Sequence, residues 1–101
     1  GKLGADLTTE QGYAAARECA IEILRSVWNA HGTLDGLKVL KVLGCVNCTP
    51  DFIDQPAVVN GCSDFFVEVL GDKGRHARSA VGVSGLPFDC SVEVEAIVEV
   101  E

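Results

Sequence analysis

The sequence predicts an α+β fold in two layers, with two helices packed on one face of a β-sheet. Two segments carry apolar residues at three- and four-residue intervals, as amphipathic helices do, and three others are rich in β-branched residues, as strands are. Their order along the chain is helix, strand, helix, strand, strand. With 101 residues, of which 48% are hydrophobic, the chain can bury one core, so residues 1–101 are expected to form a single domain.

The first helix is expected to follow Thr8 and to end before Gly32. Thr8 to Gln11 reads as a capping box, in which the threonine and glutamine side chains bond each other's free backbone amides. Glycine readily adopts the left-handed conformation that ends helices. The apolar stripe that should face the core consists of Ala16, Cys19, Ala20, Ile23, Leu24, Val27 and Trp28.

A strand is expected from Val39 to Cys48, although Lys38 and Lys41 interrupt strict two-residue alternation. Pro50 ends this strand because proline cannot donate a hydrogen bond to a sheet.

A second helix is expected from Asp54, as its N-cap, to about Leu70, with Pro56 in the first turn and Gly71 as the stop. Its buried side should hold Val58, Val59, Cys62, Phe65, Phe66 and Val69.

The last two strands are expected at Ala77–Ser84 and Ser91–Glu101. Gly85–Asp89 reads as a turn, which predicts that these strands pair as a hairpin. The final strand alternates sharply, with Val92, Val94, Ala96, Val98 and Val100 on one face and Glu93, Glu95, Ile97, Glu99 and Glu101 on the other.

The charge balance narrows the classes of partner. Fifteen acidic residues against eight basic ones give a formal net charge of −7, and no basic run could neutralise a row of phosphates. Nucleic acid is therefore not an expected partner. No apolar run is long enough to cross a bilayer and no signal or lipidation motif is present, so we expect a cytoplasmic protein without membrane contact.

The five cysteines fall in predicted helices and strands, which indicates free thiols in a reducing compartment. Cys45 and Cys48 have the C-x-x-C spacing, but residues three apart in a strand point to opposite faces. Neither a second such pair nor a pair of histidines completes a metal-ligand set. Buried or edge thiols are therefore expected, and no metal site.

Residues His76 to Val100 resemble the C-terminal signature of the Rid family, the reactive intermediate deaminases also called YjgF-like proteins. That signature has an Arg-Ser step opening a strand, here Arg78 and Ser79, then a Leu-Pro turn, here Leu86 and Pro87, and a final strand bearing glutamate, here Glu93. Both helices and the middle strand also fall where the family has them, so the resemblance covers essentially the whole chain.

The resemblance implies a chorismate-mutase-like fold, assembled as a homotrimer with clefts at the subunit interfaces. It implies hydrolysis of 2-imino acids to 2-keto acids and ammonia, with no cofactor. Matched by position, Arg78 would anchor the substrate carboxylate, Glu93 would orient or polarise the attacking water, and Asn60 would line the cleft. The family cysteine often found two positions after the arginine is Ala80 here, which excludes thiol chemistry at that place.

Family members usually begin with a β-hairpin that helps to line the pocket, and this sequence begins at the position that follows that hairpin in the family. The resemblance therefore predicts a domain truncated at its N-terminus. The same prediction accounts for a sheet of only three strands, whose edges proteins normally pair or cover. Otherwise another chain would have to supply strands.

Simpler interpretations of the same residues remain. Arg78 could be a strand-opening cation paired with Asp64 or Asp72, and Glu93 one of a row of solvated glutamates. Asn60 could be an exposed or capping residue, and His76 a loop histidine. Two other functions also stay open: a non-catalytic module that binds a small ligand or serves assembly, and an endoribonuclease, which the negative charge disfavours.

Overall fold

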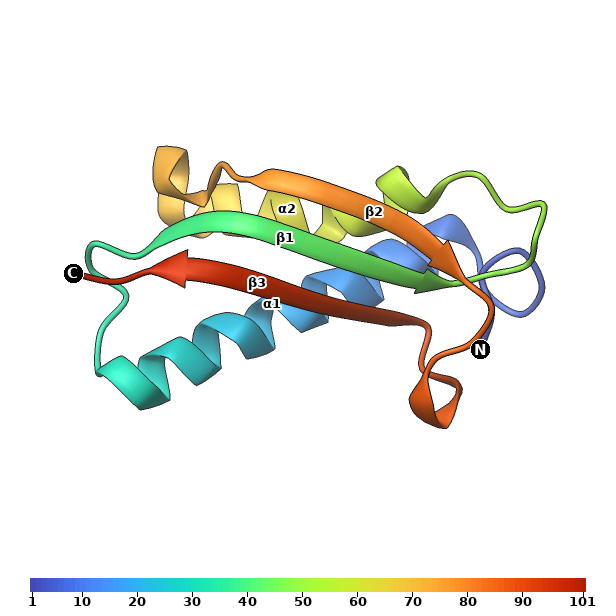
Figure 1. Ribbon diagram of the computed structural model, residues 1–101, viewed down its shortest axis with the longest axis horizontal. Coiled ribbons are helices and arrows are strands. Elements are labelled where there is room, and N and C mark those ends of the chain that lie inside the picture. The colour runs from blue at the N-terminus through green and yellow to red at the C-terminus, as the bar shows by residue number, and fades with distance from the viewer.

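The computed structural model describes residues 1–101 as a three-stranded sheet with two helices on one of its faces (Figure 1). The helices are α1 (Thr9–His31) and α2 (Gln55–Leu70). The strands are β1 (Lys38–Asn47), β2 (Ala77–Val83) and β3 (Val92–Glu99). Short 3-10 turns at Gly71–Gly74 and Pro87–Asp89 follow α2 and β2. The predicted two-layer α+β architecture is confirmed, and in Figure 1 the strands lie in front of both helices with nothing covering their near face.

Local signals in the sequence set the ends of the helices. The Thr8 hydroxyl accepts a hydrogen bond from the Gln11 amide at 3.2 Å, and the Gln11 side chain accepts one from the Thr8 amide at 2.9 Å. Gly32 ends α1 with φ 82°, and Gly71 ends α2 with φ 63°. Asp54 is the N-cap residue of α2, as predicted, although its side chain makes no capping hydrogen bond.

The strand order is β2-β1-β3, with β1 parallel to β2 and antiparallel to β3. The predicted hairpin between the last two strands is therefore wrong, because β1 lies between them. Val39, Val42 and Val46 of β1 are fully buried, as suits the central strand of a sheet. The connection after β2 must cross about 10 Å, the width of two strand spacings, to reach the far edge of the sheet.

Asn47, at the end of β1, binds the crossing connection. Its side chain is fully buried, and Nδ2 donates to the Asp89 carboxylate at 3.1 Å and to the Cys90 carbonyl at 3.1 Å. Its Oδ1 accepts a hydrogen bond from Lys2 Nζ at 2.7 Å. The amide therefore joins the N-terminal segment, β1 and the β2–β3 connection at one point.

A register shift between Val39 and Lys41 explains the interrupted alternation at the start of β1. Val39 and Val42 are three residues apart, which would place them on opposite faces of a regular strand. The shift inserts one residue, so both valines point into the core and Leu40 stays exposed.

The two helices approach closely through small residues. The buried residues of α1 are Gly12, Ala16, Ala20 and the larger Leu24, and a side chain added at Gly61 of α2 would overlap the backbone of α1. Trp28 and Val69 were predicted to face the core but are 54% and 45% exposed, so the prediction is wrong at these two positions. Phe66 of α2 is fully buried and forms the largest part of the core.

Strand β3 alternates as predicted, with Val92 in the core and the glutamates exposed. Neither helix combines the length and the apolar character needed to cross a bilayer.

Candidate functional site

Arg78 and Asn60, both expected in the site, lie together at the edge where α2 meets β2. Arg78 Nη1 donates a hydrogen bond of 2.7 Å to Asn60 Oδ1. Arg78 pairs in register with Val42, whose side chain is buried against the helices, so the arginine lies on the helix-facing side of β2. Asn60 is exposed on α2, and its side chain binds the arginine and does not cap a helix end.

Arg78 has no carboxylate partner. The two aspartates that offered a simpler interpretation are engaged elsewhere: Tyr13 donates to Asp64 at 2.8 Å, and Arg75 Nε donates to Asp72 at 3.2 Å. Arg17 and Arg25 each pair with a glutamate of their own. The interpretation of Arg78 as one half of a surface ion pair is therefore wrong, and its guanidinium remains a cation without an anion.

Ser63 and His76 continue the contacts behind Arg78. The Ser63 hydroxyl lies 3.3 Å from Arg78 Nη1 and 2.9 Å from His76 Nε2, and His76 Nδ1 lies 2.6 Å from the Gly74 carbonyl. The imidazole also meets the ring of Phe66 edge-on, with centroids 5.9 Å apart. His76 lies in the loop before β2, as the simpler interpretation expected, and it is half-buried with a hydrogen-bond partner for each ring nitrogen.

Ser63 is the member of this group that sequence reasoning missed. It lies one helical turn after Asn60, and residues three apart in a helix share a face. The sequence signal for Ser63 is therefore its three-residue spacing from Asn60. Both residues belong to a helix that is expected to lie beside the strand carrying Arg78. A single serine among helix residues carries little information without the neighbouring strand.

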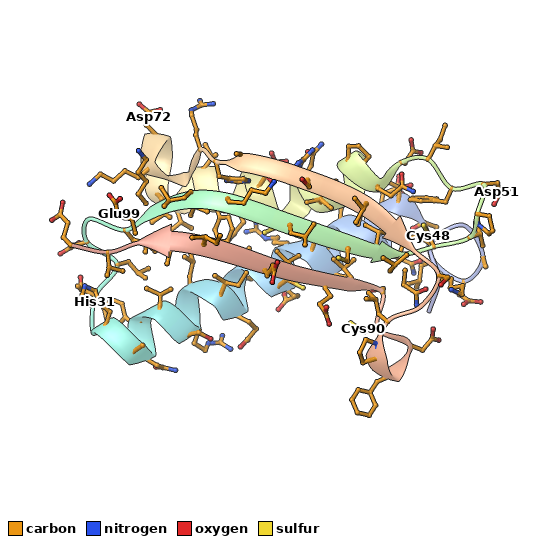
Figure 2. All side chains as sticks on the ribbon, viewed as in Figure 1. His31, Cys48, Asp51, Asp72, Cys90 and Glu99 are labelled. Atoms are coloured by element: carbon orange, nitrogen blue, oxygen red, sulfur yellow. The ribbon has the colours of Figure 1, made fainter.

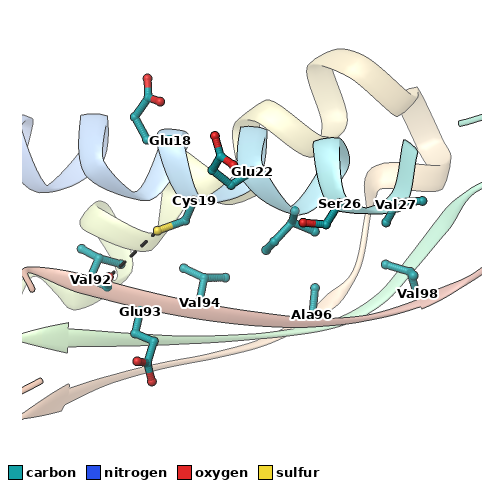
Figure 3. A pocket seen from close by; sticks show the side chains of 11 residues that line it. Glu18, Cys19, Glu22, Ser26, Val27, Val92, Glu93, Val94, Ala96 and Val98 are labelled. Carbon is teal, nitrogen blue, oxygen red and sulfur yellow. Dashed lines mark hydrogen bonds between the residues drawn. The ribbon is translucent and has the colours of Figure 1, made fainter. Parts of the chain in front are cut away.

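Glu93 lies away from this group within one chain. It belongs to β3, at the opposite edge of the sheet from β2, and pairs in register with Cys45. Its side chain points away from α1, to the face that no helix covers (Figure 3). Arg78 and Glu93 are thus on opposite edges and opposite faces of the sheet.

Two hollows border these edges. A groove of about 530 Å³ runs between α1 and β3, where Val92, Val94, Ala96 and Val98 form its apolar floor (Figure 3). A hollow of about 570 Å³ lies where β1 and β2 end and α2 begins, bounded by Gln55 and Gly82. Since side chains two apart in a strand share a face, Gly82 continues the face of β2 that carries Arg78.

The cysteines are free thiols. Burial raises the pKa of Cys62 to about 12, a change that nearby Cys19 increases and Arg78 opposes. Burial also raises the pKa of Cys45, and the carboxylates of Glu93 and Glu95 add to this effect. Figure 2 shows Cys48 at the end of β1 and Cys90 in the connection before β3. No three side chains of the metal-binding types converge in the structure.

These contacts define what the arrangement can do chemically. A guanidinium presents a planar fork that matches a carboxylate and stays charged at any working pH. Asn60 and Ser63 hold one nitrogen of Arg78, and the cation faces no competing acid. The edge between α2 and β2 is suited to binding a small carboxylate.

Comparison with known proteins places this fold in a family. The family described as "YjgF/chorismate mutase-like, putative endoribonuclease" matches residues 1–100. Protein TCP17 of Trypanosoma cruzi is 50% identical over 98% of the chain. The crystal structure of Atu1372 from Agrobacterium tumefaciens, a protein of unknown function, is 44% identical and superposes over 100% of the chain with a TM-score of 0.97. A "putative endoribonuclease" of Shewanella oneidensis is 30% identical over 93% of the chain, with a TM-score of 0.89.

The chain is shorter than these relatives. It covers 63% of TCP17, 66% of Atu1372 and 63% of the Shewanella protein. The match nevertheless runs through both helices and all three strands described above. The chain therefore belongs to the YjgF/chorismate-mutase-like family.

Proposed function

We propose that the protein is a deaminase of the Rid type, which hydrolyses 2-imino acids to 2-keto acids and ammonia without a cofactor. The observation that carries the proposal is the unpaired guanidinium of Arg78, held by Asn60 at 2.7 Å at an exposed edge. A 2-imino acid carries a carboxylate next to its reactive carbon. Binding that carboxylate to Arg78 would fix the distance from the imine carbon to the groups around it.

The chemistry requires a positioned water. In the proposed reaction, water adds to C2 of the imine, the C–N bond of the resulting carbinolamine breaks, and ammonia leaves. Glu93 accepts a hydrogen bond from the attacking water and so orients it. A carboxylate on a β-strand is held rigidly enough for this role, and Glu93 is exposed.

Arg78 and Glu93 lie on opposite edges of the sheet, so we propose that the site forms between two copies in a homotrimer. Arg78 of one subunit then meets Glu93 of the partner subunit. The uncovered sheet face and the exposed Val81 and Ile97 support an assembly of this kind. The hollow beside Gln55 and Gly82 offers space for the substrate side chain.

The test is a trapping assay. An amino-acid oxidase generates 2-iminopropanoate in the presence of semicarbazide, and added protein should divert the imine and so slow semicarbazone formation. Arg78→Ala should abolish this effect. Arg75→Ala is the matched control, since Arg75 lies three residues away and is paired with Asp72. Failure of the parent protein to divert imine, or full activity of Arg78→Ala, would overturn the proposal.

Endoribonuclease activity is the second candidate, because the family description and the Shewanella relative carry that name. The net charge of −7 and the glutamates of β3 oppose RNA binding. The same preparations should be incubated with a labelled single-stranded RNA. Cleavage that persists through purification and is lost in Arg78→Ala would favour this candidate over the deaminase.

A further inference from the structure

We infer that Ser63 and His76 are positioning residues. Ser63 holds Nη1 of Arg78 directly and His76 holds it through Ser63, which leaves Nε and Nη2 of the guanidinium free to bind the carboxylate of the substrate. This inference rests on the proposed function, which it deepens by naming how the anchoring arginine is held. Nothing in the family assignment concerns these two side chains. A series of hydrogen bonds connects Arg78 through Ser63 and His76 to the backbone of Gly74.

Arg78 uses Nη1 for both of its side-chain hydrogen bonds. A guanidinium nitrogen of this kind carries two N–H groups, and here one points to Asn60 Oδ1 at 2.7 Å and the other to Ser63 Oγ at 3.3 Å. Nη1 is therefore fully used. Arg78 makes no other side-chain hydrogen bond and no ion pair, so Nε and Nη2 stay free. These two nitrogens form one edge of the planar fork, the edge that can grip a carboxylate through two parallel bonds.

The hydrogen bonds of this series all run in one direction, from donor to acceptor. Because arginine only donates, Ser63 accepts from Arg78 and its own hydroxyl proton is left for His76 Nε2, 2.9 Å away. His76 Nδ1 must then carry the ring proton, which it donates to the Gly74 carbonyl at 2.6 Å. Each group donates to the next, from Arg78 through Ser63 and His76 to the backbone.

The hydrogen bonds of this series end at buried groups of the core. Gly74 is buried in the turn after α2, where a side chain would collide with the backbone of Phe66, so its carbonyl has a fixed direction. The fully buried ring of Phe66 contacts the edge of the imidazole at an interplanar angle of 88°. The far end of this series of hydrogen bonds is therefore held by buried groups of the core. Such fixed orientation is what gives a carboxylate anchor its precision.

The experiment compares variants by steady-state kinetics on 2-iminobutanoate and by calorimetric titration with 2-oxobutanoate. Ser63→Ala and His76→Phe should each raise KM and the Kd for 2-oxobutanoate roughly five- to tenfold, because each breaks the series of hydrogen bonds that orients Arg78, with kcat little changed. Phenylalanine preserves the ring contact with Phe66 and removes both hydrogen bonds. Ser63→Thr keeps the hydroxyl and should restore the parent values, and Ser26→Ala, at an exposed position of α1 beside the groove with β3, is the control.

The outcomes separate this inference from the proposed function. If Arg78→Ala abolishes binding while Ser63→Ala and His76→Phe keep the parent KM and Kd, the function stands and the positioning role is wrong. If the parent binds 2-oxobutanoate but does not turn over imine, the deaminase is wrong and the Kd series alone decides the positioning role. If the parent does not bind 2-oxobutanoate, both are overturned. A Ser63→Thr variant as weak as Ser63→Ala would also contradict the inference.

Discussion

Gly61 of α2 lies directly against the backbone carbonyl of Tyr13 in α1, so close that no side chain fits between the helices. Gly61→Ala would place a methyl group inside the contact distance of that oxygen. Because both partners are backbone atoms of helices, the helices must move apart to accommodate it. We expect a loss of about 1–3 kcal/mol in the free energy of unfolding, measured by urea denaturation.

Gly85→Ala is the control for this prediction. Nothing lies within 4 Å of the position where its Cβ would be, and its backbone does not need the left-handed region. Its unfolding free energy should stay within about 0.5 kcal/mol of the parent. A Gly61→Ala protein as stable as Gly85→Ala would show that the helices are not in close contact there.

Asn47 should be the polar residue most sensitive to truncation. Asn47→Ala removes the partner of the Cys90 carbonyl, the Asp89 carboxylate and Lys2 Nζ at a buried position. We expect a loss of about 2–3 kcal/mol by urea denaturation, since a fully buried side chain and its hydrogen bonds to three segments are lost together. Asn29→Ala, an exposed change in α1, should cost less than about 0.5 kcal/mol. Equal stability of the two variants would contradict the joining role of Asn47.

The thiol of Cys62 predicts how stability falls at alkaline pH. Burial raises its pKa from 9.0 to about 12, so between these values the folded protein binds a proton that the unfolded chain releases. The stability is therefore fully present below pH 9 and declines as the pH rises towards 12. Urea denaturation across this range should show the decline in the parent and a shallower one in Cys62→Ala. The same slope in both proteins would contradict the prediction.

Asn60→Asp tests whether Arg78 must remain free of a protein carboxylate. The new acid would lie where Asn60 Oδ1 now accepts from Nη1 at 2.7 Å and would pair with the guanidinium. We expect the KM for a 2-imino acid to rise roughly tenfold or more, because the substrate carboxylate meets a neutralised cation. The urea midpoint should stay at or above that of the parent. An unchanged KM would show that the substrate does not use Arg78.

The sequence predicts the elements of this fold well, because their signals are local. The capping box at Thr8, the glycine at position 32 and the alternation of β3 each act within a few residues, and the structure confirms them. The strand order depends on distant contacts instead. Gly85–Asp89 resembles a hairpin turn locally, and the pairing of β1 with both β2 and β3 is what makes this segment cross the sheet.

The candidate site, like the fold, could be predicted from the sequence only in part. Arg78 and Asn60 were named from the resemblance, and the structure brings them into contact. Ser63 and His76 could not be assigned from the sequence, because their roles depend on the packing of α2 beside β2 and on the carbonyl of Gly74. Glu93 stays a prediction, since its partner in the proposed reaction belongs to another copy of the chain.

The most direct test of the account is a mixing experiment with Arg78→Ala and Glu93→Gln, each of which should be inactive alone in the semicarbazide assay. If the two residues meet between subunits, trimers refolded from an equal mixture contain some interfaces with both residues intact. Random assembly gives roughly one quarter of the parent activity. Activity that stays at the level of the separate variants, or a Glu93→Gln protein that is active alone, would contradict an active site built from Arg78 and Glu93 of neighbouring subunits.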